Sequence, residues 1–312
     1  MLSIAAIGFF WRLTSLGPGT GETSSVRPQF QKTENFPLKL AAKPAAPKPA
    51  VGTLKPESDF YKVVSDNARA ALDGNGRAAL HVYQALKVCQ LVVALYGKTS
   101  DPKNAFDTHW ANTPNAPPWV IDKSREEFQA CSGFFSGNPF VELPDQSSDY
   151  DSSGYWLKLA YEDGDPVAQS IMAGANLARS TMEKVAERRD EAFDSAQSDI
   201  NQAAITGDPE ALFHIGSQIS NGYGVDPIEG FAVSLAACQL GYDCSAKNNE
   251  AIFGSCVDAG GCAPGINFTD IVVQSIGSNG YVAADRRAQE LISALSIGDA
   301  ATIQQFVRLK KP

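Results

Sequence analysis

The chain has 312 residues, of which 44% are hydrophobic, enough material for a sizeable core. Its formal net charge is −9, but residues 1–56 carry +5, which leaves −14 for residues 57–312. An acidic body excludes nucleic acid as the expected partner, since phosphate contacts need clustered lysine and arginine. The basic tail is compatible with an anionic membrane surface, and equally with a soluble linker.

The first twelve residues are apolar up to Trp11 and end at Arg12. This run is shorter than the roughly 20 residues of a membrane span. It resembles the apolar core of a signal peptide, although no lysine or arginine precedes it. We expect residues 1–12 to be a signal or membrane-anchor segment. Three interpretations stay open: a short signal-anchor, a cleaved signal, or a start-site artefact on a soluble protein.

Residues 13–56 have the composition of a linker. Glycine, serine and threonine dominate first, and a Pro/Ala/Lys segment follows at 41–50. Such a segment favours the extended polyproline II conformation and acts as a semi-rigid spacer. The low hydrophobicity and missing period of these residues predict disorder.

From residue 57 onward apolar residues recur at helical spacing, and no alternating run of strand length stands out. We therefore predict an all-α domain over residues 57–312. The expected helices span 57–72, 77–97, 124–134, 209–220, 227–240, 246–257, 268–277, 281–296 and 300–309, with one or two long helices over 167–206. Residues 98–122 and 135–152 are rich in Pro, Asn, Asp and Ser, and are predicted to be loops.

One small turn recurs four times between these helices. Glycine can end a helix in the left-handed conformation, and Asp or Asn beside it can cap the next helix. Proline fits the first helical position, where its missing N–H costs nothing. The four copies, progressively looser, are Gly164-Asp165-Pro166, Gly207-Asp208-Pro209, Gly298-Asp299-Ala300 and Gly74-Asn75-Gly76. The repetition predicts a chain of helical hairpins.

Six cysteines are compatible with three disulfides, and the number alone allows fifteen pairings. The last four form two units of identical C-x5-C spacing, each across an expected helix end. We predict the pairs Cys89–Cys131, Cys238–Cys244 and Cys256–Cys262. A four-thiolate zinc site is disfavoured because its spacing is usually narrower, and free structural thiols are the other alternative. Disulfides would place the protein in an oxidising compartment.

Residues 203–241 resemble a Sel-one-like repeat, a relative of the tetratricopeptide repeats. The resemblance rests on Ala203-Ala204, Gly207-Asp208, Ala211, Ile215-Gly216, Asn221-Gly222-Tyr223-Gly224-Val225, Ala232, Leu235-Ala236-Ala237 and Gly241. Residues 156–177 match the opening of a second copy. Ile228 and Phe231 depart from the usual acidic residue and lysine. The turns lie 43, 90 and 91 residues apart, one or two units of a helical repeat. The resemblance implies a right-handed α-solenoid of antiparallel hairpins, irregular here, in a family whose members act as adaptors.

No pattern of a catalytic, cofactor or metal site is recognisable, so none is predicted. His81, His109 and His214 show no metal-ligand spacing, and the chain has no G-x-S-x-G or phosphate-loop motif. The candidate partner-binding residues are Trp110 and Trp119, because exposed aromatic residues are enriched at interface hot spots. The alternative is that both tryptophans fold back onto the first helices.

The sequence therefore predicts a non-catalytic helical-repeat scaffold or adaptor that binds a protein or peptide. It would lie in the bacterial periplasm, tethered to the inner membrane through residues 1–12, or else be secreted. A cell-envelope enzyme, for example one acting on peptidoglycan, and a purely structural spacer are the alternatives. No cofactor is expected.

Overall fold

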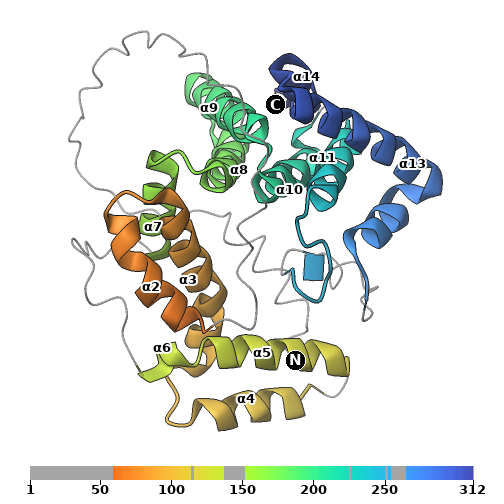
Figure 1. Cartoon of the computed structure of the whole chain (residues 1–312). Helices are drawn as coiled ribbons and strands as arrows, with labels where there is room; N and C mark the ends of the chain where they lie inside the picture. The colour runs from red at the N-terminus through yellow and green to blue at the C-terminus, as the bar shows by residue number, and fades with distance from the viewer. Residues whose placement is uncertain are drawn as a thin grey trace.

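The computed structural model describes residues 59–113, 116–136, 152–224, 226–249, 252–253 and 265–311. These residues are mostly helical and contain no strand beyond two isolated bridges. The predicted helical class is therefore confirmed for this part of the chain (Figure 1). The helices are α2 Phe60–Leu72, α3 Gly76–Tyr96, α4 Pro102–Ala111, α5 Pro118–Ala130, α6 Gly133–Ser136, α7 Ser152–Glu162, α8 Pro166–Met182, α9 Ala186–Ile205, α10 Pro209–Gln218, the π-helix η1 Ile219–Tyr223, α11 Pro227–Gln239, α13 Phe268–Ile297 and α14 Ala300–Phe306.

All four Gly-Asx turns end one helix and start the next, as the sequence predicts. The glycines at 74, 164, 207 and 298 have φ between 68° and 90°, the left-handed region that glycine adopts without strain. The following Asp or Asn caps the next helix by accepting hydrogen bonds from its first N–H groups. At Gly164, its own N–H and that of Asp165 bond back to the carbonyls of Tyr161 and Ala160, a Schellman closure.

Helices pack mainly with sequence neighbours. α8 contacts α9, α10 contacts α11, and α11 contacts α13. α3 packs on α2 and on α7, although α4, α5 and α6 lie between α3 and α7 in the sequence. α3, α8 and α10 each begin at a Gly-Asx turn. α8 pairs with α9 and α10 pairs with α11, whereas the inserted helices α4, α5 and α6 separate α3 from its partner α7 in the sequence.

The core is continuous along these pairs. Large side chains such as Leu80, Trp156, Leu177, Ile200 and Leu212 are almost fully buried in one cluster. Among the described helices α3 is the one that is long and apolar enough to cross a membrane. Because its apolar side chains contribute to this core and it packs against α2 and α7, we interpret α3 as a core helix.

The expected loop at 98–122 is wrong, since it contains α4 and the start of α5. Asp101 caps α4 and Pro102 occupies its first position, a strong local start signal. Phe106 and Trp110, four residues apart, bury one face against Tyr96 and Phe128 in a second small core. The inserted helices thus have a core of their own.

The disulfide Cys89–Cys131 joins α3 to the end of α5 and confirms that predicted pair. Both cysteines are buried.

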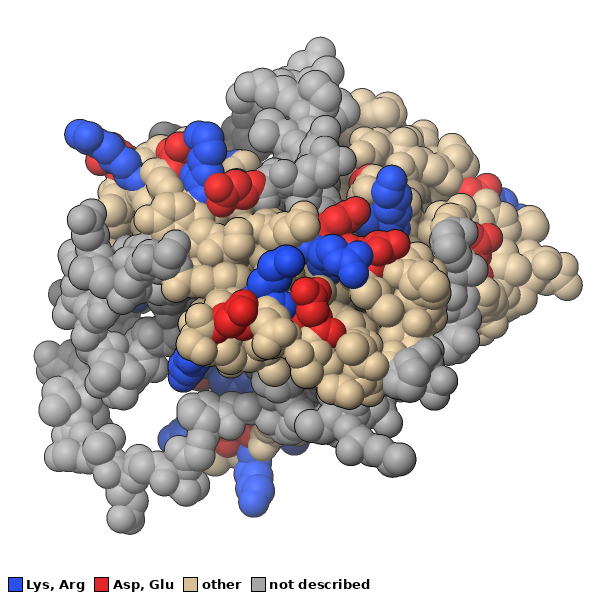
Figure 2. All heavy atoms as spheres, turned by 90° about the horizontal axis from the view of Figure 1, so that it is seen from below, with Lys and Arg blue, Asp and Glu red and all other residues tan. Residues whose placement is uncertain are grey.

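The surface over α4 and α5 carries lysine and arginine side chains interleaved with aspartate and glutamate (Figure 2). The described side chains on this face form no large patch of one sign.

Two glycines allow α10 and α11 to approach closely. A Cβ on Gly216 would lie 2.6 Å from the carbonyl oxygen of Gly230 and from the amide nitrogen of Ser234. A Cβ on Gly230 would lie 2.3 Å from the amide nitrogen of Ser220. Glycine at 216, part of the repeat-like pattern, is therefore required by backbone contact between the two helices.

The expected helices at 268–277 and 281–296 are both present. Together they form α13, which is kinked at Gly277. Gly277 has φ 71° and ψ 170°, outside the helical region, and Figure 1 shows α13 bending sharply along its length. Residues 167–206 form two helices, α8 and α9, separated at 183–185. Residues 1–12 and 13–56 lie outside the described residues, as do 250–251 and 254–257 of the expected helix at 246–257. The expected start of that helix is wrong, because residues 246–248 form a turn, and helical geometry is found at 252–253.

Candidate functional site

In the part of the chain that the structure describes, a dense group of ionisable side chains gathers where α3, α8 and α10 begin. Arg77, at the start of α3, places Nε 2.8 Å from Asp165 Oδ2 and Nη2 2.7 Å from Asp208 Oδ2. Its Nη1 lies 3.9 Å from Glu210 Oε2, and Gln84 Nε2 donates to Glu210 Oε1 at 2.5 Å. We call these five residues the Arg77 cluster.

The cluster is a direct consequence of the repeated turn. Asp165 and Asp208 are the caps of α8 and α10, and Arg77 follows Asn75, the cap of α3, by two positions. Because the three helices lie with these ends together, the guanidinium reaches the caps of both other helices. A planar group with five donors suits this bridging better than an ammonium.

Every carboxylate in the cluster already has an internal task. Asp165 accepts from the N–H groups of Val167 and Ala168, and Asp208 accepts from those of Glu210 and Ala211. The side chain of Asp165 is 4% exposed and that of Arg77 27% exposed. Such a saturated network joins elements that are distant in sequence, and it leaves little capacity for a substrate.

Burial shifts the titration of this region. It raises the pKa of Glu210 to about 7, and nearby Asp208 adds to that rise while Arg77 opposes it. Desolvation also raises the pKa of Asp165, against the opposing effect of Arg77. Desolvation lowers the pKa of His81, with Arg77 as a second cause, and lowers that of His214 to about 4.

Perturbed pKa values gather at active sites but also in structural ion-pair networks. Here the ionisable groups bind one another and the helix ends, so the geometry favours a structural role. Among the described residues, no three His, Cys, Asp or Glu side chains are placed to hold a metal ion. Sequence reasoning found the two cap residues of this cluster but missed Arg77, whose partner Asp208 lies 131 positions away.

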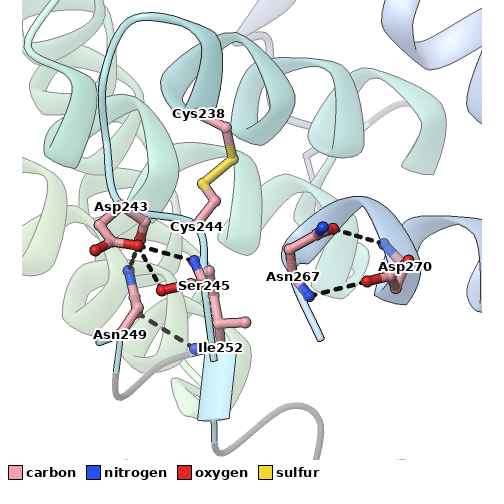
Figure 3. Close-up of a disulfide and its surroundings, with 8 residues drawn as sticks. All are labelled: Cys238, Asp243, Cys244, Ser245, Asn249, Ile252, Asn267 and Asp270. Atoms are coloured by element: carbon pink, nitrogen blue, oxygen red, sulfur yellow. Dashed lines mark hydrogen bonds between the residues drawn. A yellow bond between two sulfur atoms is a disulfide. The ribbon is translucent and has the colours of Figure 1, made fainter. Parts of the chain in front are cut away.

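A second feature is the loop that follows α11, closed by the predicted disulfide Cys238–Cys244 (Figure 3). Asp243 accepts hydrogen bonds from the N–H and Oγ of Ser245, and Asn249 Nδ2 donates to the Asp243 carbonyl. These contacts organise the chain after the helix, so the disulfide pins an ordered turn. Cys256 and Cys262 lie outside the described residues.

The two tryptophans predicted to bind a partner lie within the inserted helices. Trp110 is 8% exposed and packs against Phe106 of its own helix, within the second small core that also contains Tyr96 at the end of α3. Trp119 is partly buried and meets the ring of Phe253 edge-on at a centroid distance of 5.3 Å. The structure does not bring the two into one exposed aromatic patch.

A cavity of about 340 Å³ lies at the C-terminal segment, which sequence reasoning did not single out. It is lined by Ser180 and Thr181 at the end of α8, Phe193 of α9, Tyr223 of η1 and the lysines at 310 and 311. The cavity thus lies between two successive helix pairs. Hydroxyl, aromatic and cationic groups face it, a mixture suited to binding polar peptide groups.

No protein-family model matches the chain, and no curated protein or solved structure is significantly similar to it. The fold and the candidate sites therefore provide the evidence on function.

Proposed function

We propose that this chain is a non-catalytic helical-repeat scaffold that binds a protein or peptide partner in an oxidising compartment outside the cytoplasm. The observation that carries the proposal is the Arg77 cluster. It joins the equivalent ends of α3, α8 and α10, each of which starts at a Gly-Asx turn. Side-by-side helix pairs in register are the building principle of helical-repeat scaffolds, which offer elongated binding surfaces.

A further sequence repetition supports a repeat origin. Ser220-Asn221-Gly222-Tyr223 returns as Ser278-Asn279-Gly280-Tyr281. The first copy contains Gly222 with φ 104°, and the second follows Gly277 with φ 71°. Both copies therefore lie at a break between a shorter helix and the helix that follows it. We infer that residues 268–297 are a degenerate copy of the unit formed by α10, η1 and α11.

The two disulfides support the compartment, since such bonds persist in oxidising surroundings such as the periplasm or the extracellular space. We propose a periplasmic location with residues 1–12 as a tether. Thiol counting by mass spectrometry on protein from its native compartment tests this. The six cysteines should resist alkylation until a reductant is added, and six alkylated thiols without reductant would contradict the proposal. Membrane fractionation of the full chain against a chain lacking residues 1–12 tests the tether.

Partner binding is tested by cross-linking the full chain in its native compartment and then reconstituting each captured protein with the purified chain. We expect saturable, stoichiometric binding in isothermal titration calorimetry. The Arg77→Gln chain, with the helix pairs released from one another, should bind more weakly, and Arg69→Gln is the matched control because it removes an equal, exposed charge. Release of soluble fragments from purified cell-wall sacculi by the full chain would instead identify an enzyme and refute the proposal.

A further inference from the structure

The segment that follows α14 lies between two helix pairs. Val307 ends the helix in a turn conformation, and Leu309 forms an isolated antiparallel bridge with Gly224. Val307 and Leu309 are buried, at 0% and 5% exposure. Arg308, which lies between them, and Lys310, which follows Leu309, are exposed. A buried Leu309 between the exposed residues 308 and 310 is the pattern of a strand residue facing a groove. The C-terminal end lies on the α9 side of α14 (Figure 1).

The groove recognises the backbone of this segment. The side-chain amide of Gln197, on α9, donates to the carbonyl of Val307 at 3.2 Å and accepts from the N–H of Leu309 at 2.8 Å. On the other side the N–H of Lys310 donates to the carbonyl of Tyr223 at 2.8 Å, within an antiparallel bridge between Gly224 and Leu309. Backbone pairing on both edges with pockets for alternate side chains is how proteins bind extended peptides.

An acidic side chain at the surface and an aromatic side chain lie near the end of this segment. Lys311 Nζ lies 3.5 Å from Asp194 Oδ1 and 5.9 Å from the ring centroid of Phe193. The 340 Å³ cavity opens beside the two lysines, so a bound peptide has room for larger side chains than the chain's own segment provides. An acidic residue and an aromatic face together favour a lysine or arginine.

We propose that this groove is the site at which the scaffold binds a peptide of the pattern apolar, any residue, apolar, any residue, Lys, and that residues 307–311 occupy it in the absence of a partner. The inference rests on the proposed scaffold function and names its ligand class. A segment attached to the same chain acts at an effective concentration of about 1 mM. It would therefore mask a site with a 10 μM dissociation constant by roughly 100-fold, so a partner must displace it.

The test is fluorescence anisotropy with a labelled hexapeptide of the sequence Phe-Val-Arg-Leu-Lys-Lys. The full chain and a chain ending at Phe306 are compared. We expect the shortened chain to bind at least 30-fold more tightly than the full chain. Adding Gln197→Ala to the shortened chain should weaken binding at least tenfold, whereas Gln202→Ala, an exposed amide on the same helix, should not. A peptide of the same length with lysine in place of its Val and its Leu is the ligand control.

Circular dichroism decides whether the shortened chain is folded. Where it is not, the full chain carrying Leu309→Ser, which weakens the hold on the segment and keeps it in place, is titrated instead. Equal affinity of a folded variant and the full chain for the hexapeptide overturns the proposal, and so does unfolding of both variants, since the segment is then a structural strut. A partner captured equally by the full chain and by the variants refutes this groove but leaves the scaffold function intact.

Discussion

Replacing Arg77 by Gln removes the only cation from a buried group of three carboxylates. The side chains of Asp165 and Glu210 are 4% and 11% exposed, so both charges are largely cut off from water. Removing one partner of a buried ion pair typically costs 3–5 kcal/mol. Arg77 is itself 27% exposed and Asp165 keeps its two cap hydrogen bonds, which places our estimate at the low end, about 3 kcal/mol.

Urea unfolding followed by far-ultraviolet circular dichroism at pH 7.5 measures this loss. Arg69→Gln removes an exposed arginine from α2 and should change the free energy of unfolding by less than about 0.5 kcal/mol. In the Arg77→Gln background, Glu210→Gln should restore part of the loss because it removes one uncompensated charge, a coupling that a double-mutant cycle detects. Equal stability of the Arg77→Gln and Arg69→Gln chains would refute the reasoning that the cluster holds the helix pairs together.

Glu210 and His214 give the domain opposing pH dependences. The raised pKa of Glu210, about 7, means that its stabilising effect is complete below pH 4.5 and decreases by about 3 kcal/mol as the pH rises through 7. The lowered pKa of His214, about 4, means that its stabilising effect is present above pH 6.5 and is lost as the pH falls through 4. Acidification from pH 6.5 to 4.5 should therefore destabilise the Glu210→Gln chain and stabilise the His214→Gln chain in urea titrations, and parallel profiles would contradict both assignments. Gly216→Ala should cost about 1–3 kcal/mol in the same assay, because its Cβ meets the backbone of α11. Gly174→Ala, which meets only the flexible end of a glutamine side chain, is its control and should cost less. Replacing both Cys89 and Cys131 by Ser should lower the free energy of unfolding by about 4 kcal/mol, and replacing both Cys238 and Cys244 by Ser should lower it by about 2 kcal/mol. The difference follows from loop closure, since the paired cysteines are 42 and 6 residues apart. Equal losses from the two pairs would show that loop closure does not set their contributions.

Features that depend on a few neighbouring residues could be predicted from the sequence. The four Gly-Asx turns are such a case, because a left-handed glycine and its capping neighbour use only backbone groups within about five positions. The break of the helix near Gly277 and the pairing of Cys238 with Cys244 are local in the same sense. The start signal of the helix at Pro102 is equally local, because Asp101 caps it. The prediction of a loop at 98–122 missed this helix because it relied on the polar composition of the segment.

The sequence by itself thus determined where helices end and begin at the four Gly-Asx turns, and it identified two cysteine pairs. Tertiary structure decided which of those helix ends meet, because Arg77 finds its partners 88 and 131 positions further along the chain. It also decided that Trp110 is buried in a small second core, since its neighbours come from three helices. The groove around residues 307–311 exists only when α9 and η1 lie on either side of the segment, and no local pattern encodes the pairing of Gln197 with a backbone more than a hundred residues away.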